Sequence, residues 1–244
     1  MRITLAVVFI IAFVITSTGQ PLNNVAPKAN SKREEPLAGT EAAKAIARFG
    51  DLARPGLREK LKQMRPLAYL PDPVLRNKII EAQHLPLVSS KRVDQLKAAL
   101  QPVIAYHQRE QMPIMVVDSD QPKAALVNCL AIVITTKLMA IASDAEIRGI
   151  IAHELAHEYI WNEYKKARLA GNGKLMRECE LFCDVVAAIT LKEIGDDPAS
   201  YGRILERMTI IGINAGNAMK REPDTHPSLD VRKKLNKFLC QRLE

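Results

Sequence analysis

The pentapeptide His153-Glu154-Leu155-Ala156-His157 places two imidazoles four residues apart, with a carboxylate directly after the first. On an α-helix, residues four apart lie on one face about one turn apart, so both rings can reach a single metal ion. Neutral imidazole and a tetrahedral arrangement favour zinc, and we expect one Zn²⁺ ion here. Glu154 would lie beside the ion's open position, where it can take a proton from a water and deliver it to a leaving amine. The pattern is typical of a hydrolytic zinc site on a helix.

The residues around this pentapeptide predict where its helix begins. Ser143 can cap a helix, and Glu146 three residues later completes a capping box. The apolar residues that follow recur at helical spacing, which predicts one buried face. They are Ile147, Ile150, Ile151 and Leu155. We therefore expect a helix that starts after Ser143 and carries the pentapeptide beside the core.

The segment 176–188 supplies candidates for the third ligand that such a site requires. Because this segment is predicted to be helical, Glu180 and Asp184, four residues apart, share one face. Glu180 can ligate zinc, and Asp184 can accept a hydrogen bond from the outer ring nitrogen of a ligating histidine and fix its tautomer. Glu178 is the competing ligand, but position 182 is Phe and offers it no carboxylate partner. We favour Glu180; the alternative is that both glutamates lie on a solvated face.

The order of predicted elements indicates an α+β fold: helices, a small antiparallel sheet, then helices. Expected helices and strands alternate with segments that contain Gly or Pro. The helices cover 40–49, 55–64, 72–83 and 89–108, and the strands 113–118 and one or two within 125–135. Beyond 135 we expect helices up to the end, with loops near 171–173, 195–199 and 221–228. We expect one catalytic domain over 40–244.

The first residues of the chain resemble a targeting segment. Arg2 precedes an apolar run over 3–15, and small or polar residues follow it. This pattern predicts a signal peptide over 1–19, with an uncleaved membrane anchor as the alternative, because a spanning helix needs about 20 apolar residues. Residues 20–39 are polar and contain Pro, which predicts a flexible leader. We therefore expect an exported protein, periplasmic or extracellular.

Charge and composition exclude some partners. The formal net charge is +8, and 5% of the residues are aromatic. Spread basic residues indicate a solvated basic surface rather than a nucleic-acid site, and the scarcity of aromatics does not suggest a base-stacking platform. Weak attraction to an anionic membrane surface stays open. The spacing of the four cysteines does not resemble a disulfide framework, and two of them fit small buried residues on a helix. They are Cys129, Cys179, Cys183 and Cys240.

Several segments of the sequence occur in the same order as the motifs of a known protein family. They are the strand segment 127–130, the acidic helix start 143–146 with the HExxH pentapeptide, the ExxxD pattern 180–184 with its continuation to 198, and the His-Pro segment 225–232. Together they resemble the gluzincin metallopeptidases of family M48, the group of the CAAX-prenyl protease and the HtpX-type proteases. The resemblance covers about 113–238. It implies a mainly helical zincin-like metallopeptidase domain with a small antiparallel sheet and an HExxH helix.

The resemblance also implies an activity and a set of site residues. It implies zinc-dependent endopeptidase activity on protein or peptide substrates, with His153, His157 and Glu180 as ligands and Glu154 as general acid/base. It suggests a role for His226 near the metal, either stabilising the oxyanion or capping zinc in a resting state, and a role for Arg232 in holding that loop. In such proteases an edge strand pairs with an extended substrate, and residues 127–131 are our candidate for it.

Three alternatives accompany this interpretation. Only 22 residues separate His157 from Glu180, which is short for this family and admits an ImmA-like metallopeptidase, whose cytoplasmic setting conflicts with the leader. An inactive zinc-binding chaperone-like or scaffolding module is the second alternative. Glu154 argues against it, because a structural zinc site needs no acid/base and is usually closed by a fourth ligand. A basic protein that binds membrane surfaces is the third.

Overall fold

The computed structural model describes residues 41–49, 74, 86–127, 129–214 and 225–243 of the 244-residue chain. The chain divides into two units, Met1–Pro36 and Leu37–Glu244, and every described residue belongs to the second. The predicted signal peptide over 1–19 and leader over 20–39 lie outside the described residues, as do the helix predicted over 55–64 and nearly all of the one over 72–83. In the described part, no helix combines the length and apolar character needed to cross a membrane.

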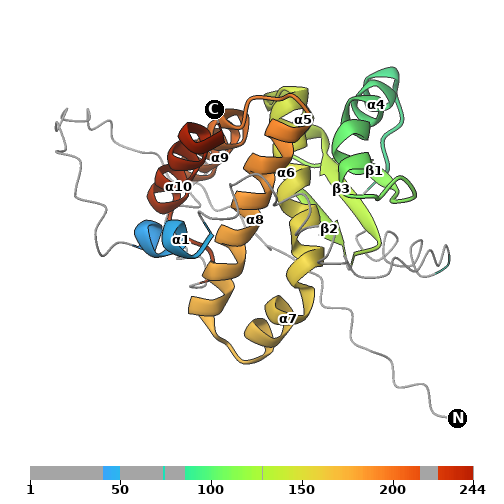
Figure 1. The fold of residues 1–244 in the computed structure, drawn as a ribbon. Helices are drawn as coiled ribbons and strands as arrows, with labels where there is room; N and C mark the ends of the chain where they lie inside the picture. Colours follow the sequence, from blue (N-terminus) through green and yellow to red (C-terminus); the bar gives the residue numbers. More distant parts are fainter. Residues whose placement is uncertain (1–40, 50–73, 75–85, 128, 215–224, 244) are drawn as a thin grey trace, which may run out of the picture. The chain divides into compact units, whose positions relative to one another are not determined.

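The described unit is mostly helical with one small sheet, which confirms the α+β prediction (Figure 1). The elements before the zinc-motif helix are α1 (Glu41–Phe49), α4 (Lys91–Tyr106), β1 (Ile114–Val117), β2 (Ala124–Val127), β3 (Ala131–Thr135) and α5 (Thr136–Ile141). The remaining elements are α6 (Asp144–Ala156), the 3₁₀ helix η2 (His157–Ile160), α7 (Trp161–Leu169), α8 (Gly173–Glu193), α9 (Ala199–Asn214) and α10 (Leu229–Leu243).

The sheet is mixed, whereas the sequence led us to expect an antiparallel one. Its order is β1-β3-β2, with β3 antiparallel to β2 and parallel to β1. The chain leaves β1 at one edge, forms β2 at the other, and returns as β3 between them. Because β2 runs opposite to β1 and β3 turns back from β2 in a hairpin, β3 runs in the direction of β1. Strand propensities do not encode this strand order, so the sequence alone could not reveal it.

The two edges of the sheet are covered differently. Beside β1, the amide of Val88 donates to the Val116 carbonyl at 2.9 Å, and Leu87 forms a bridge with Val117. On the opposite edge, β2 faces α6, which packs against it. Within the described residues, β2 therefore presents the outer backbone edge closest to the zinc-motif helix.

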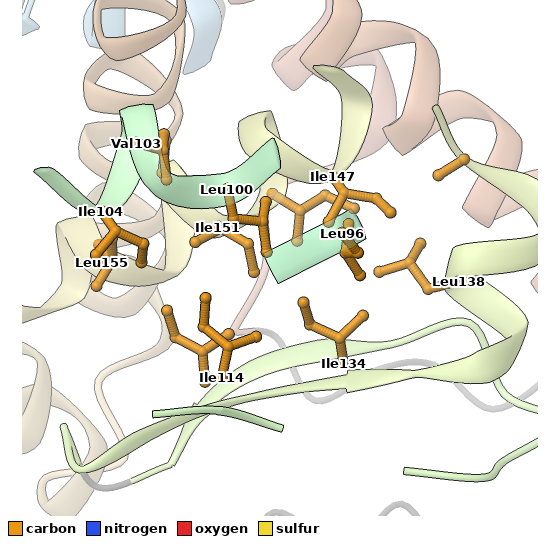
Figure 2. Close-up of a cluster of buried hydrophobic side chains, with 14 of the residues drawn as sticks. Leu96, Leu100, Val103, Ile104, Ile114, Ile134, Leu138, Ile147, Ile151 and Leu155 are labelled. Atoms are coloured by element: carbon orange, nitrogen blue, oxygen red, sulfur yellow. The ribbon is translucent and has the colours of Figure 1, made fainter. Parts of the chain in front are cut away.

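A hydrophobic core joins the sheet to α4 and α6. Figure 2 shows side chains of both helices pointing toward Ile114 and Ile134 of the sheet. Leu96, Leu100 and Ile151 are fully buried there, and burial of each such side chain stabilises the fold by roughly 1.5–3 kcal/mol. This core holds one face of α6 firmly, which gives the zinc motif a rigid support.

Helix α6 begins as its sequence predicts. The Ser143 hydroxyl accepts from the Glu146 amide at 3.3 Å, and the Glu146 carboxylate accepts from the Ser143 amide at 2.8 Å. This reciprocal capping box satisfies two amides that the first turn leaves unpaired. Farther along, a Cβ added at Gly149 would lie 3.0 Å from the Tyr201 Cβ. The glycine thus lets α9 approach α6 closely.

Helix α8 is buried along most of its length. It packs against α6 on one side and α10 on another, with α1 and α7 also in contact (Figure 1). A second hydrophobic cluster surrounds it and includes Leu181, Val185 and Leu235. Because both neighbours hold α8, the acidic residues on its α6 side are fixed opposite the zinc motif.

Candidate metal centre

The two histidines of the motif lie where one helix type gives way to another. Helix α6 ends at Ala156, and His157 begins the 3₁₀ helix η2. His157 keeps helical backbone angles (φ −58°, ψ −26°), so its ring still lies one turn beyond that of His153. The ring centroids are 5.1 Å apart. The change of helix type was not predicted, but it leaves the i, i+4 relation intact.

Glu180 of α8 completes a cluster with these two rings. Its Oε2 lies 3.3 Å from His153 Nε2, and its Oε1 lies 3.7 Å from His157 Nε2. The candidate ligand atoms of the three residues all lie within 4.8 Å of one another. Zinc binds nitrogen and oxygen ligands at about 2.0–2.2 Å, so donors at these separations can surround one ion. Two imidazoles and one carboxylate fit a catalytic zinc site, because such sites use three protein ligands and keep a position open.

The competing ligand lies elsewhere on α8. Glu178 forms an ion pair with Arg48 of α1, on the side of α8 that α1 covers. Glu180 is instead 2% exposed and next to both histidines. Burial raises the pKa of a carboxyl, but nearby His157 and His153 outweigh it and lower the pKa of Glu180 to about 2. The structure thus separates the two glutamates that the sequence left as alternatives.

Asp184 holds the outer nitrogen of His153. Its Oδ1 lies 3.0 Å from His153 Nδ1, the contact that we predicted for a ligating histidine. Burial disfavours a charged imidazole, but hydrogen bonds and charges from Asp184 and Glu180 outweigh it and raise the pKa of His153 to about 9. With the Nδ1 proton directed at Asp184, Nε2 is the ring nitrogen that faces the cluster, and it can bind a metal ion when its own proton leaves.

Asp184 is itself held by two residues from later helices. Arg232 of α10 donates to both carboxylate oxygens, at 2.8 and 2.6 Å, and the Tyr201 hydroxyl of α9 donates to Oδ1 at 2.6 Å. Burial acts against the charge, yet Arg232 holds the pKa of Asp184 well below its usual range. The Tyr201 oxygen also lies 2.8 Å from His153 Nδ1. Arg232, for which the resemblance suggested a role in holding the loop of His226, fixes this network.

His157 has different neighbours. Its Nδ1 lies 3.5 Å from the Cys183 sulfur, and the Tyr164 ring packs against it with centroids 5.0 Å apart. Burial lowers the pKa of His157 despite the opposing charge of Glu180. A weakly polar thiol therefore orients this ring where a carboxylate orients His153.

Glu154 faces the edge of the sheet. Its Oε2 accepts a hydrogen bond from the Leu126 amide of β2 at 3.0 Å. Leu126 is paired with Ile132, whose own amide donates to the Pro113 carbonyl at 3.0 Å, so the Leu126 amide points away from β3. The outer edge of β2 and the Glu154 carboxylate therefore border the same space.

The edge strand next to Glu154 lies earlier in the chain than the segment that we expected. We expected residues 127–131, but Cys129 and Leu130 form the turn between β2 and β3. Cys129 has a φ of +57°, which a tight turn requires and an extended strand does not allow. The edge strand next to Glu154 is β2, Ala124–Val127. Apolar branched residues run through this whole region, and they do not mark where the turn falls.

His226 lies on the solvent side of the cluster. Its Nε2 is 3.8 Å from Glu180 Oε1, its Nδ1 is 3.0 Å from the Thr225 hydroxyl, and its side chain is 38% exposed. A residue 46 positions after Glu180 thus reaches the same carboxylate as the two motif histidines. The structure brings this predicted site residue to the cluster.

Sequence reasoning missed four residues around the centre. They are Leu126, Tyr164, Cys183 as a partner of His157, and Tyr201. A lone tyrosine on an amphipathic helix gives no signal in a single sequence, and a backbone amide gives none. Position 183 was predicted only as a small buried residue, which it is. The separation of His157 and Cys183 in the sequence did not reveal that their side chains are in contact.

Two comparisons with known proteins bear on this centre. The model of peptidase family M48 matches residues 90–167, about a third of the chain, from α4 to α7, and so includes the whole HExxH pentapeptide. A search of curated proteins finds no match. Glu180 and His226 lie beyond the matched residues, and it is the fold that joins them to the motif. Residues 90–167 of this chain therefore match peptidase family M48, which is consistent with a zinc metallopeptidase.

Proposed function

We propose that this protein is a zinc-dependent endopeptidase of the M48 type that hydrolyses peptide bonds within protein substrates. The observation that carries the proposal is the convergence of His153, His157 and Glu180 beside a carboxylate, Glu154, that is not part of the cluster. A structural zinc site needs no such additional carboxylate. A hydrolytic one needs a proton acceptor within reach of its water.

Different residues of the chain would bind the ion, orient its ligands and transfer the proton. His153 Nε2, His157 Nε2 and Glu180 would hold the ion, and Asp184 and Cys183 would orient the two rings. A bound zinc ion lowers the pKa of a water and polarises the scissile carbonyl. Glu154 accepts one proton as the water oxygen bonds to the carbonyl carbon. When the C–N bond breaks, Glu154 returns that proton to the leaving nitrogen.

The substrate would bind as an added strand. The outward-facing backbone groups of β2 belong to Ala124 and Leu126, and the β1 edge is already occupied by residues 87–88. An extended peptide paired with β2 through its backbone would pass beside Glu154. Such recognition uses backbone hydrogen bonds, so it suits substrates of varied sequence. We propose that His226 then contacts the substrate or covers the cluster from the solvent side.

The substitution Glu154→Gln tests this proposal. Gln keeps the shape of Glu154 but cannot accept the proton, so we expect casein cleavage to fall about 10²–10⁴-fold. Zinc content, measured by atomic absorption, should stay at one ion per chain because Glu154 is not in the ligand cluster. Glu163→Gln on α7 is the matched control, since Glu163 is exposed and outside the cluster.

Each alternative outcome has a clear meaning. Equal cleavage by the wild type and Glu154→Gln would remove Glu154 as the acid/base. A wild type that binds zinc but cleaves no casein and no casein-derived peptide would support the inactive zinc-binding module instead. Salt-dependent sedimentation with anionic vesicles in place of cleavage would favour a membrane-surface protein.

A further inference from the structure

Tyr164 borders the metal centre but takes no part in the network that orients it. It lies in the first turn of α7, directly after η2, and is half-buried. Its ring meets that of His157 edge to face, with centroids 5.0 Å apart and an interplanar angle of 63°. A packed ring of this kind is held in place, so its hydroxyl is held at a defined position near the cluster.

The hydroxyl of Tyr164 differs from those of Tyr201 and Tyr159 in its hydrogen bonding. The Tyr201 hydroxyl binds Asp184, and the Tyr159 hydroxyl lies 2.9 Å from His107 Nδ1. Among the residues that the structure describes, the Tyr164 hydroxyl has no hydrogen-bond partner. It is also not sealed in the interior, because the side chain is only half-buried. The Tyr164 hydroxyl is therefore fixed in orientation and can still form a hydrogen bond with a bound molecule.

The Tyr164 phenol is protonated at neutral pH. An ordinary tyrosine hydroxyl has a pKa of about 10, and burial raises the pKa of Tyr164 above that value. A neutral phenol beside the centre can act as a hydrogen-bond donor throughout the neutral pH range.

We propose that Tyr164 is a catalytic residue whose hydroxyl donates a hydrogen bond to the scissile carbonyl oxygen as that oxygen becomes negatively charged. The inference rests on the proposed function, because it assigns a residue to the same hydrolysis. The carbonyl must lie next to the cluster, and the Tyr164 ring packs directly against His157 of that cluster. A donor already fixed by packing needs no reorganisation during the reaction, so its stabilisation of the developing charge is fully available.

His226 is the competing donor for this role. Its Nδ1 is engaged with Thr225, and its side chain is 38% exposed, so solvent competes for its contacts. Tyr164 is more shielded, and shielding strengthens a hydrogen bond to a charged oxygen. The structure therefore favours Tyr164 as the fixed donor.

The substitution Tyr164→Phe removes only the hydroxyl and keeps the ring against His157. We expect kcat for a casein-derived peptide to fall about 10- to 100-fold while KM changes little, since the contact forms mainly in the transition state. Zinc content should be unchanged. Tyr159→Phe is the matched control: it also removes one tyrosine hydroxyl, but that hydroxyl binds His107, outside the centre.

A binding measurement gives a second readout. The probe is an N-phosphoryl dipeptide, whose tetrahedral anionic group resembles the hydrolytic transition state. Calorimetry on the zinc-loaded chain should show about 10-fold weaker binding to Tyr164→Phe than to the wild type and to Tyr159→Phe. Equal binding and equal kcat in all three proteins would overturn the assignment of Tyr164.

The two proposals fail in different ways. If the wild type cleaves casein and Tyr164→Phe cleaves it equally well, the endopeptidase proposal stands and the Tyr164 proposal is wrong. If the wild type cleaves nothing but binds the probe more tightly than Tyr164→Phe, the oxyanion contact stands without the endopeptidase. A wild type that neither cleaves nor binds the probe contradicts both.

Discussion

The two motif histidines are chemically unequal although the motif treats them alike. His153 meets the charged Asp184, and hydrogen bonds and charge raise its pKa to about 9. His157 meets the thiol of Cys183, and burial lowers its pKa. The difference arises from adjacent residues on α8, one of which carries a charge. Asp184 makes His153 the more basic of the two imidazoles, and more basic imidazoles bind metal ions more strongly.

The carboxylate of Glu180 should contribute strongly to the affinity of the centre for zinc. We expect Glu180→Gln to weaken zinc binding by more than about 100-fold, the upper range for changes that only reorient a ligand. Gln has the same size but lacks the negative charge that Glu180 places between the two rings. Competition with a fluorescent zinc chelator measures the dissociation constant.

The other glutamate of α8 provides the control for this measurement. Glu178→Gln should leave zinc affinity unchanged, because Glu178 pairs with Arg48 away from the cluster. Exposed ion pairs contribute about 0–1 kcal/mol, so the fold should also persist. If Glu178→Gln lost zinc and Glu180→Gln kept it, the third ligand would have to be reassigned.

At the scale of single elements, the start of α6 is held from two directions. Ser143 and Glu146 cap each other, and Arg207 of α9 donates to both Glu146 oxygens at 3.0 and 3.1 Å. Burial opposes the charge of Glu146, but its hydrogen bonds to Ser143 and Arg207 lower its pKa below the usual value of 4.5. The helix that carries the zinc motif is therefore anchored by an ionised carboxylate.

This anchor predicts a stability that depends on pH. A lowered folded-state pKa stabilises the fold above the unfolded value, and the contribution disappears as pH falls through the folded one. Glu146→Gln keeps the capping geometry but not the charge, so we expect about 1 kcal/mol lower free energy of unfolding at pH 7. The difference should shrink below about pH 4.5. Urea unfolding at several pH values measures it.

Glu206→Gln on α9 is the matched control for this pH dependence. Glu206 forms an exposed pair with Lys233 at 2.8 Å, and such pairs contribute little. Its free energy of unfolding should follow that of the wild type across the pH range. A constant gap between Glu146→Gln and the wild type down to pH 3 would show that the Glu146 charge is not responsible.

At the scale of the whole molecule, the centre forms where two hydrophobic clusters meet. One cluster joins the sheet, α4 and α6, and the other surrounds α8 with α10. Helix α6 supplies His153, α8 supplies Glu180 and Asp184, α9 supplies Tyr201 and α10 supplies Arg232. Because four helices contribute, the geometry of the centre depends on the complete fold rather than on any one segment.

Export is a prediction that concerns the whole chain. The apolar run over 3–15 is shorter than the roughly 20 residues of a spanning helix, so we propose that residues 1–19 are a cleaved signal peptide. Intact mass spectrometry of the protein recovered after expression in a secreting host should show loss of these residues. Full-length protein that sediments with membranes would instead indicate an uncleaved anchor.

The sequence by itself determined the features that depend on neighbours a few residues away. The i, i+4 spacing of His153 and His157, the capping box of α6 and the shared face of Glu180 and Asp184 all follow from helical geometry. The strand segments also followed from their branched residues. These features are local, and helix and strand periods act locally.

Only the tertiary structure decided what depends on packing between distant segments. It separated Glu180 from Glu178, brought Tyr201 and Arg232 to Asp184, set β3 between β1 and β2, and placed the Leu126 amide on Glu154. Residues dozens of positions apart come into contact because whole helices pack through their buried faces. The spacing of residues in the sequence does not predict those contacts.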